Sequence, residues 1–170
     1  QSIGIKAGDR VGTLAWNGYR HFELYYGVGG MGSVVHTINP RLHPEQIAWI
    51  INHGGDRALA FDLTFLPLIE AVAPHCPKVE HWIAMVDADR QPVSDKIPGL
   101  INYETLLAGG KTDWQWPSFD ENTACCLCYT SGTTGNPKGA LYSNRSSVLH
   151  AYGASLPDAM SASARDAILP

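Results

Sequence analysis

Short apolar runs alternate with longer amphipathic runs along the first two thirds of the chain. Four of the apolar runs have the length and composition of buried β-strands: residues 10–16, 33–38, 58–61 and 81–86. The runs between them carry apolar residues at helical spacing and end near glycine or proline: residues 19–31, 43–54 and 65–72. Strands and helices that alternate in this way form right-handed βαβ units. The pattern predicts an α/β fold with a parallel sheet flanked by helices.

The last third of the chain has a different pattern. Its expected elements, in order, are a surface loop over 87–98, a short helix around 103–107, a loop that ends at Pro117, a strand over 123–129, a loop over 130–139, a strand over 140–142 and a helix over 145–156. The two strands and the loop between them predict a hairpin, and Ser143 or Asn144 can cap the helix that follows. We therefore divide the chain into a βαβ subdomain, residues 1–118, and residues 119–170, which hold the hairpin and the start of a further subdomain.

Composition supports a globular domain and excludes two classes of partner. The 170 residues are 45% hydrophobic and 16% charged, which suffices for one substantial core. The chain has 12 Lys and Arg and 16 Asp and Glu, so its net charge is -4. There is no basic excess to neutralise a nucleic-acid backbone. The longest apolar stretches fall short of the roughly 18 residues that a membrane span needs. The chain begins at Gln1 without a signal sequence and ends on an apolar 168–170, so we expect a piece of a longer protein.

Cysteine and histidine usage gives no metal or disulfide signature. Cys125, Cys126 and Cys128 would alternate faces along a strand, so we interpret them as small buried apolar side chains rather than as a tetrahedral metal site. Cys76 has no evident partner, which indicates a reducing, cytoplasmic compartment. The histidines lack zinc-site spacing, and we expect most of them to be structural or surface residues. His36 is the exception, because it lies near the end of a parallel strand, where open α/β sheets bind ligands.

The stretch from Tyr129 to Gly139 carries the chemical information. Hydroxyl side chains occupy four of the five positions from 130 to 134, and glycines, one lysine and no acidic residue accompany them. Glycine lets backbone N–H groups turn towards an anion, hydroxyls add neutral donors, and a lysine adds charge. The composition also fits a plain surface hairpin, but Pro137-Lys138-Gly139 directly before a strand favours a phosphate-binding loop. It is not a Walker A loop, because Pro137 and Gly139 flank the lysine.

At these residues the sequence resembles the adenylate-forming acyl-CoA synthetases, whose signature is an aromatic residue followed by Thr-Ser-Gly-Thr-Thr-Gly-x-Pro-Lys-Gly. Residues 129–139 meet every fixed position of that signature. The segment His36–Leu42 is similar to the His-Thr-x-Asn-Pro-Arg-Leu of fatty-acid-directed members, and 142–146 is similar to their Tyr-Ser-His-Arg segment. Asn144 replaces the usual histidine there. The resemblance implies that the chain is part of the large N-terminal domain of such an enzyme.

The resemblance also implies a reaction and a set of contacts. A carboxylic acid attacks the α-phosphorus of ATP, Mg²⁺ assists, and coenzyme A then displaces AMP to give a thioester. The residues expected to hold the nucleotide are Thr130, Ser131, Gly132, Thr133, Thr134, Gly135, Lys138 and Gly139. Among them, Thr133 would also hold Mg²⁺, and Lys138 would stabilise charge during catalysis.

The remaining expectations concern substrate, assembly and alternatives. The His36–Leu42 segment favours a medium- or long-chain fatty acid as the substrate, and family members of this kind suggest a homodimer. The contacts to adenine, ribose, acyl chain and coenzyme A would lie beyond residue 170, so we expect the chain alone to be inactive. The alternatives are an adenylating enzyme for aryl or amino acids and a non-catalytic nucleotide-binding module.

Overall fold

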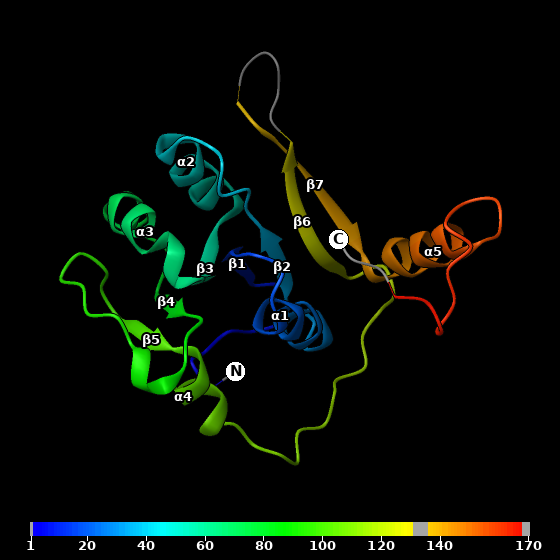
Figure 1. Cartoon of the computed structure of the whole chain (residues 1–170), viewed down its shortest axis with the longest axis horizontal. Helices are drawn as coiled ribbons and strands as arrows, with labels where there is room; N and C mark the ends of the chain where they lie inside the picture. The colour runs from blue at the N-terminus through cyan, green and yellow to red at the C-terminus, as the bar shows by residue number, and fades with distance from the viewer. Residues whose placement is uncertain (1, 131–135, 168–170) are drawn as a thin grey trace.

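The structure is a computed structural model, and it describes residues 2–130 and 136–167. Those residues form a seven-stranded sheet with the order β5-β4-β3-β1-β2-β6-β7 (Figure 1). The strands are β1 (Arg10–Leu14), β2 (Val34–Thr37), β3 (Asp56–Phe61), β4 (His81–Ala84), β5 (Leu100–Asn102), β6 (Ala124–Thr130) and β7 (Lys138–Ser143). Neighbouring strands are parallel except β6 and β7, which are antiparallel. The predicted parallel sheet and the predicted hairpin are both confirmed.

Helices cover both faces of this sheet. They are α1 (Tyr19–Gly30), α2 (Pro44–Gly54), α3 (Leu66–Val72), α4 (Tyr103–Ala108) and α5 (Asn144–Ser155), with short 3₁₀ turns η1 (Leu63–Phe65), η2 (Ala73–His75) and η3 (Ala88–Arg90). Helices α2 and α3 lie on one face and α1 and α4 on the other, while α5 follows β7 at the far edge (Figure 1). The α/β class with helical layers on the sheet is therefore confirmed.

The sequence of strand β3 from residue 58 to residue 61 is a continuous apolar run because both faces of the strand are buried. Leu59 and Phe61 pack with α2 and α3, whereas Ala58 and Ala60 pack on the opposite face. All four side chains are fully buried. A strand covered on both sides has no solvent face, so the alternation of polar and apolar residues disappears.

Helix α2 illustrates how local sequence sets the ends of an element. Its N-cap is His43, proline occupies the first helical position, and the helix ends at Gly55, whose φ is +70°. Proline loses no hydrogen bond at the start of a helix, and glycine adopts the left-handed conformation at the end without steric cost. The predicted bounds of this helix are confirmed, and its C-terminal end is placed beside the β6 strand described below.

The segment 109–123 connects α4 to β6 and passes the end of α1 (Figure 1). Trp116 lies against Gly30, where an added Cβ would come within 2.6 Å of the indole ring. Phe119 lies near Gly32, which has a φ of +79°. Small residues at the end of α1 therefore leave room for the aromatic side chains of this connection.

Strand β5 was not predicted from the sequence pattern. It has only three residues, which is too short for a periodic signal, and it forms by pairing with β4. The Asn102 side chain at its end accepts a hydrogen bond from the Thr105 amide and so caps α4. Within residues 2–130 and 136–167, no helix has both the length and the apolar character needed to cross a bilayer.

Candidate functional site

The β6–β7 hairpin holds both ends of the predicted phosphate loop. Thr130 is paired with Lys138 and Tyr129 with Gly139 in the antiparallel ladder. The prediction of a loop over 130–139 was wrong at its ends, because Thr130 closes β6 while Lys138 and Gly139 open β7. Glycine, threonine and lysine are typical of loops in a sequence, but backbone pairing with the opposite strand extends the hairpin through them here.

Only part of the predicted phosphate site lies in the described chain. The side chains of Thr130 and Lys138 are both exposed, one at each end of the loop, and Pro137 is buried directly before β7. The remaining predicted phosphate ligands lie outside the described residues: Ser131, Gly132, Thr133, Thr134 and Gly135. The predicted Mg²⁺ contact of Thr133 is therefore untested.

Gly139 lies at a close approach between the two strands. A Cβ at this position would lie 3.1 Å from Cζ of Tyr129 and 3.3 Å from Cδ1 of Leu127. Both distances are shorter than ordinary van der Waals contact, so any larger residue requires the Tyr129 ring and the Leu127 side chain to shift by a few tenths of an ångström. The glycine therefore lets the ring of the aromatic residue that precedes the loop lie close to β7.

Side chains of α2 contact Tyr129 on the face of the sheet that this helix covers. Its hydroxyl forms a 2.5 Å hydrogen bond with Nδ1 of His53, in the last turn of α2. The His53 ring stacks on Trp49 at 4.5 Å, and the Tyr129 ring meets both rings edge-on. Burial raises the pKa of Tyr129, and the nearby Asp56 carboxylate adds to that rise. The phenol is neutral at physiological pH and can take part in this hydrogen bond.

Behind Tyr129 lies a completely buried histidine–aspartate pair. Nδ1 of His36 is 2.8 Å from both carboxylate oxygens of Asp56, and neither side chain is exposed. The His36 ring centroid is 5.2 Å from that of Tyr129. Burial raises the pKa of Asp56, while the hydrogen bond from His36 and the charge of Arg10 oppose that rise. His36, the one histidine for which the sequence left a ligand contact open, is fully buried beneath the strand that leads to the loop.

Glycines make room for this pair. A Cβ on Gly12 would lie 2.8 Å from Oδ2 of Asp56, and a Cβ on Gly54 would lie 3.1 Å from the His36 ring. Arg10 donates a 2.7 Å hydrogen bond from Nε to the Gly54 carbonyl and so fastens the end of α2 to β1. Neither glycine shows a motif in the sequence, because the partners that require them come from other strands.

Asn144, the departure from the family pattern, has a defined structural contact. Its side-chain amide donates a 3.0 Å hydrogen bond to the Thr123 carbonyl at the start of β6. Ser143, the other predicted cap, is the N-cap of α5 and forms a capping box with Ser146. The contact of Asn144 therefore ties the beginning of α5 to the beginning of β6, at the end of the hairpin away from the loop.

The strand cysteines differ from the prediction of buried apolar side chains. All of them are partly exposed, and all four cysteines of the chain are free. Residues two apart on a strand share a face, and the sulfurs of Cys126 and Cys128 are 3.7 Å apart. A hydrogen bond between these thiols raises the pKa of Cys126 and lowers that of Cys128 to about 6.

The chemistry of the described loop ends fits an anion. Thr130 supplies a hydroxyl and Lys138 an ammonium group, and residues 129–139 include no carboxylate. Among residues 2–130 and 136–167, no three His, Cys, Asp or Glu side chains are grouped so that they could hold a metal ion. A triphosphate suits such a loop, and Mg²⁺ is commonly bound through substrate phosphates with few protein ligands.

The parallel sheet, its helical layers and the hairpin loop at its edge define an α/β domain of the adenylate-forming class. The chain belongs to the family of AMP-binding enzymes, whose sequence model matches residues 1–170. It is 52% identical over 99% of its length to a 3-methylmercaptopropionyl-CoA ligase of Ruegeria lacuscaerulensis. It is 51% identical, again over 99%, to a medium-chain-fatty-acid–CoA ligase of Ectopseudomonas oleovorans. The chain spans 31% of the length of each relative.

A solved structure shares both the fold and a measurable sequence identity. The crystal structure of an anthranilate CoA ligase in complex with anthranoyl-AMP matches with a TM-score of 0.80 and 26% identity. The match covers 89% of this chain and 28% of that enzyme. The architecture of the described residues is therefore that of a CoA ligase domain.

The close approach at Gly139 leads to a stability prediction. Gly139→Ala should lower the free energy of unfolding of the intact protein by about 1–3 kcal/mol, because the new methyl group pushes the Tyr129 ring from its contacts. Gly153→Ala is the matched control, since a Cβ there meets no atom within 4 Å. Alanine in helix α5 should leave stability unchanged or raise it. Equal denaturation midpoints for the wild type and Gly139→Ala would contradict the assigned packing.

Proposed function

We propose that the protein containing this chain is an ATP-dependent acyl-CoA synthetase. It activates a carboxylic acid as an acyl-adenylate with release of pyrophosphate, and it then transfers the acyl group to the thiol of coenzyme A. The observation that carries the proposal is the 129–139 sequence, placed between paired strands with Thr130 and Lys138 exposed at its two ends. The names of the relatives as CoA ligases support it.

The acid that we propose is aliphatic. One relative is named for a methylmercaptopropionyl substrate and another for medium-chain fatty acids, which are both aliphatic carboxylic acids. The likeness of His36–Leu42 to fatty-acid-directed enzymes agrees with this choice. His36 itself is fully buried against Asp56, so we assign it structural support rather than contact with the acid. Adenylation of aryl or amino acids and a non-catalytic module are not favoured.

The chain contributes positioning and charge rather than a nucleophile. The carboxylate oxygen of the acid attacks the α-phosphorus, and the bond from that phosphorus to the bridging oxygen of pyrophosphate breaks. Lys138, with the hydroxyls of Thr130, Ser131, Thr133 and Thr134, would hold the β- and γ-phosphates in line and stabilise the charge that develops on pyrophosphate. When bound, Mg²⁺ supplies further charge neutralisation, and the hydroxyl of Thr133 is its proposed protein ligand.

Backbone pairing and one side-chain contact support the proposed site at the two strand ends. The Thr130–Lys138 pairing and the hydrogen bond from Tyr129 to His53 fix the two strand ends before the loop begins. Gly132, Gly135 and Gly139 would give the backbone room next to the phosphates. A homodimer and a cytoplasmic location stay predictions.

The reaction is tested with the intact protein, ATP, Mg²⁺ and a panel of acids. Aliphatic acids should stimulate pyrophosphate release, and coenzyme A should convert the adenylate into a thioester with release of AMP. Aryl acids and amino acids form the comparison set. Absence of acid-dependent pyrophosphate release with every member of the panel would refute the proposal.

Lys138 provides a sharper test of the loop. Lys138→Ala should slow adenylate formation by about 10²–10³-fold, which is typical for loss of one charge-stabilising group, and should slow thioester formation from preformed adenylate far less. Lys111→Ala is the matched control, because Lys111 is also exposed but lies in the 109–123 connection. Quenched-flow measurement of the two half-reactions separates these effects. Equal losses in both steps would show that the lysine does not act on the triphosphate.

A further inference from the structure

One face of helix α1 exposes three aromatic side chains to solvent. Phe22, Tyr25 and Tyr26 lie three and four positions apart on that face, and the exposed fraction reaches 67% at Tyr26. The ring centroids of Phe22 and Tyr26 are 4.8 Å apart, so the two rings form one continuous surface. Aromatic side chains bury about 150–250 Å² each when covered, and about half of that area is exposed here. Contiguous apolar surface of this extent is typical of an interaction site.

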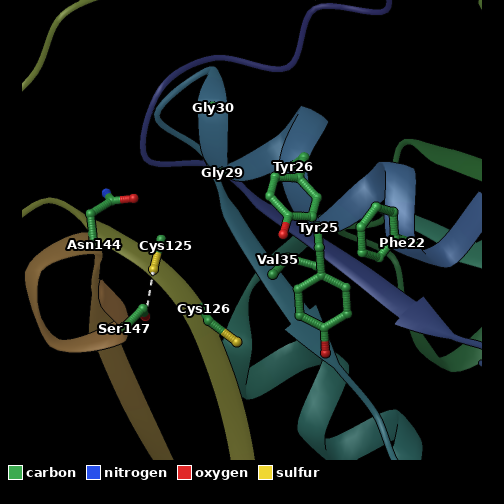
Figure 2. Close-up of a pocket in the computed structure, with 10 residues that line it drawn as sticks. All are labelled: Phe22, Tyr25, Tyr26, Gly29, Gly30, Val35, Cys125, Cys126, Asn144 and Ser147. Carbon is green, nitrogen blue, oxygen red and sulfur yellow. Dashed lines mark hydrogen bonds between the residues drawn. The ribbon is translucent and has the colours of Figure 1, made fainter. Parts of the chain in front are cut away.

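The aromatic face is one wall of a groove that β6 and the start of α5 complete. The groove has a volume of about 630 Å³. Figure 2 shows the aromatic side chains on the α1 side of it and Asn144 and Ser147 on the α5 side. None of the described residues that line it carries a charge. Nucleic acids and anionic membranes need basic side chains, whereas the centre of a protein interface is rich in aromatic residues and poor in charges.

Helix α5, on the other side of the groove, has no apolar layer of its own. No residue of this helix is buried by the part of the chain that the structure describes. The hydrogen bonds that attach it lie at its first turn, as with Asn144 and the Thr123 carbonyl. Val148 and Tyr152 continue from Asn144 at a spacing of four, and both are exposed. A helix of 12 residues is marginal in water unless an apolar face packs against something.

The length of the relatives indicates what covers these helices. The chain spans 31% of each of the two CoA ligases named above, so more than two thirds of such a protein lies outside these residues. Chain that is covalently joined to this domain is present at a high effective concentration. A second copy would lose translational and rotational freedom on binding, and α5 would lack its partner in every monomer. A permanent partner within the same protein therefore suits α5 better than a separate molecule.

We propose that the aromatic face of α1, the groove, and the row from Asn144 to Tyr152 on α5 form the surface on which the rest of the same protein packs. The covering part is apolar, with neutral hydrogen-bonding groups opposite Asn144 and Ser147. Because α5 follows β7 directly, this packing also restrains the strand that begins at Lys138. The inference rests on family membership and on the length of the relatives, and it does not depend on the proposed reaction.

The test is hydroxyl-radical footprinting of the purified intact protein, separated by gel filtration into monomer and any oligomer. Phe22, Tyr26 and Tyr152 should be modified several-fold less than their exposure in this chain implies. Val93 is the control, because it is 91% exposed in the segment before β5, and it should react in proportion to that exposure. Each rate is divided by the intrinsic reactivity of its residue type, so different residues can be compared.

A charge placed on the aromatic face gives an independent measurement. Tyr26→Asp should lower the thermal midpoint of the intact protein by about 4 °C or more, because the carboxylate enters an apolar interface. Val93→Asp is the matched control and should change the midpoint by about 1 °C or less, since it places the same charge in solvent. If Tyr26→Asp does not fold, the footprint of the wild type decides.

Each outcome supports or overturns the proposed packing. Protection of Phe22 and Tyr26 in the monomer supports it. Full reactivity in the monomer overturns it, and so does protection confined to a dimer, which would assign the face to a second copy. Equal midpoints for the wild type and Tyr26→Asp also overturn it. Both experiments omit ATP, acid and coenzyme A, so a failure here is distinguishable from a failure of the proposed ligase activity.

Discussion

The parallel pairing of β6 with β2 is the contact on which the position of the site depends. It aligns Val35 with Cys126 and Thr37 with Cys128, residues about 90 positions apart in the chain. Because the strands are parallel, the end of β6 lies at the same edge of the sheet as the carboxyl ends of β1, β2 and β3 (Figure 1). Open α/β sheets bind their ligands at that edge. The two ends of the predicted phosphate loop, Thr130 and Lys138, therefore lie at that edge of the sheet.

A second layer of contacts holds the strand end in place. The buried His36–Asp56 pair lies under the Tyr129 ring, and His53 binds the Tyr129 hydroxyl from the end of α2. Burying a carboxylate without a partner is unfavourable, and the contact with His36 offsets that cost for Asp56. Removing either partner would leave an uncompensated polar group in the core. The predicted phosphate loop thus follows a strand end that buried contacts hold in place, as catalysis by positioning would require.

The sequence pattern predicted the α/β class, the hairpin and the α2 bounds because these follow from local signals: apolar runs, helical spacing, and proline and glycine at helix ends. It missed β5, whose three residues carry no period, and it assigned Lys138 and Gly139 to the loop because strand pairing decides their conformation. Contacts such as Tyr129 with His53 join segments far apart in the chain, and no spacing rule reveals them. The Cys126–Cys128 pair was available from the two-residue period of a strand, but treating three cysteines as one set concealed it.

The central claim is that the strand ends of this hairpin place Lys138 and the loop hydroxyls around a triphosphate. A crystal structure of the intact protein with a non-hydrolysable ATP analogue and Mg²⁺ tests it most directly. We expect the β- and γ-phosphates within hydrogen-bonding distance of Lys138 Nζ and of the hydroxyls in 130–134, with Tyr129 still bonded to His53. A triphosphate bound elsewhere, with no contact to the hairpin, would contradict the proposed role of Lys138 and the loop.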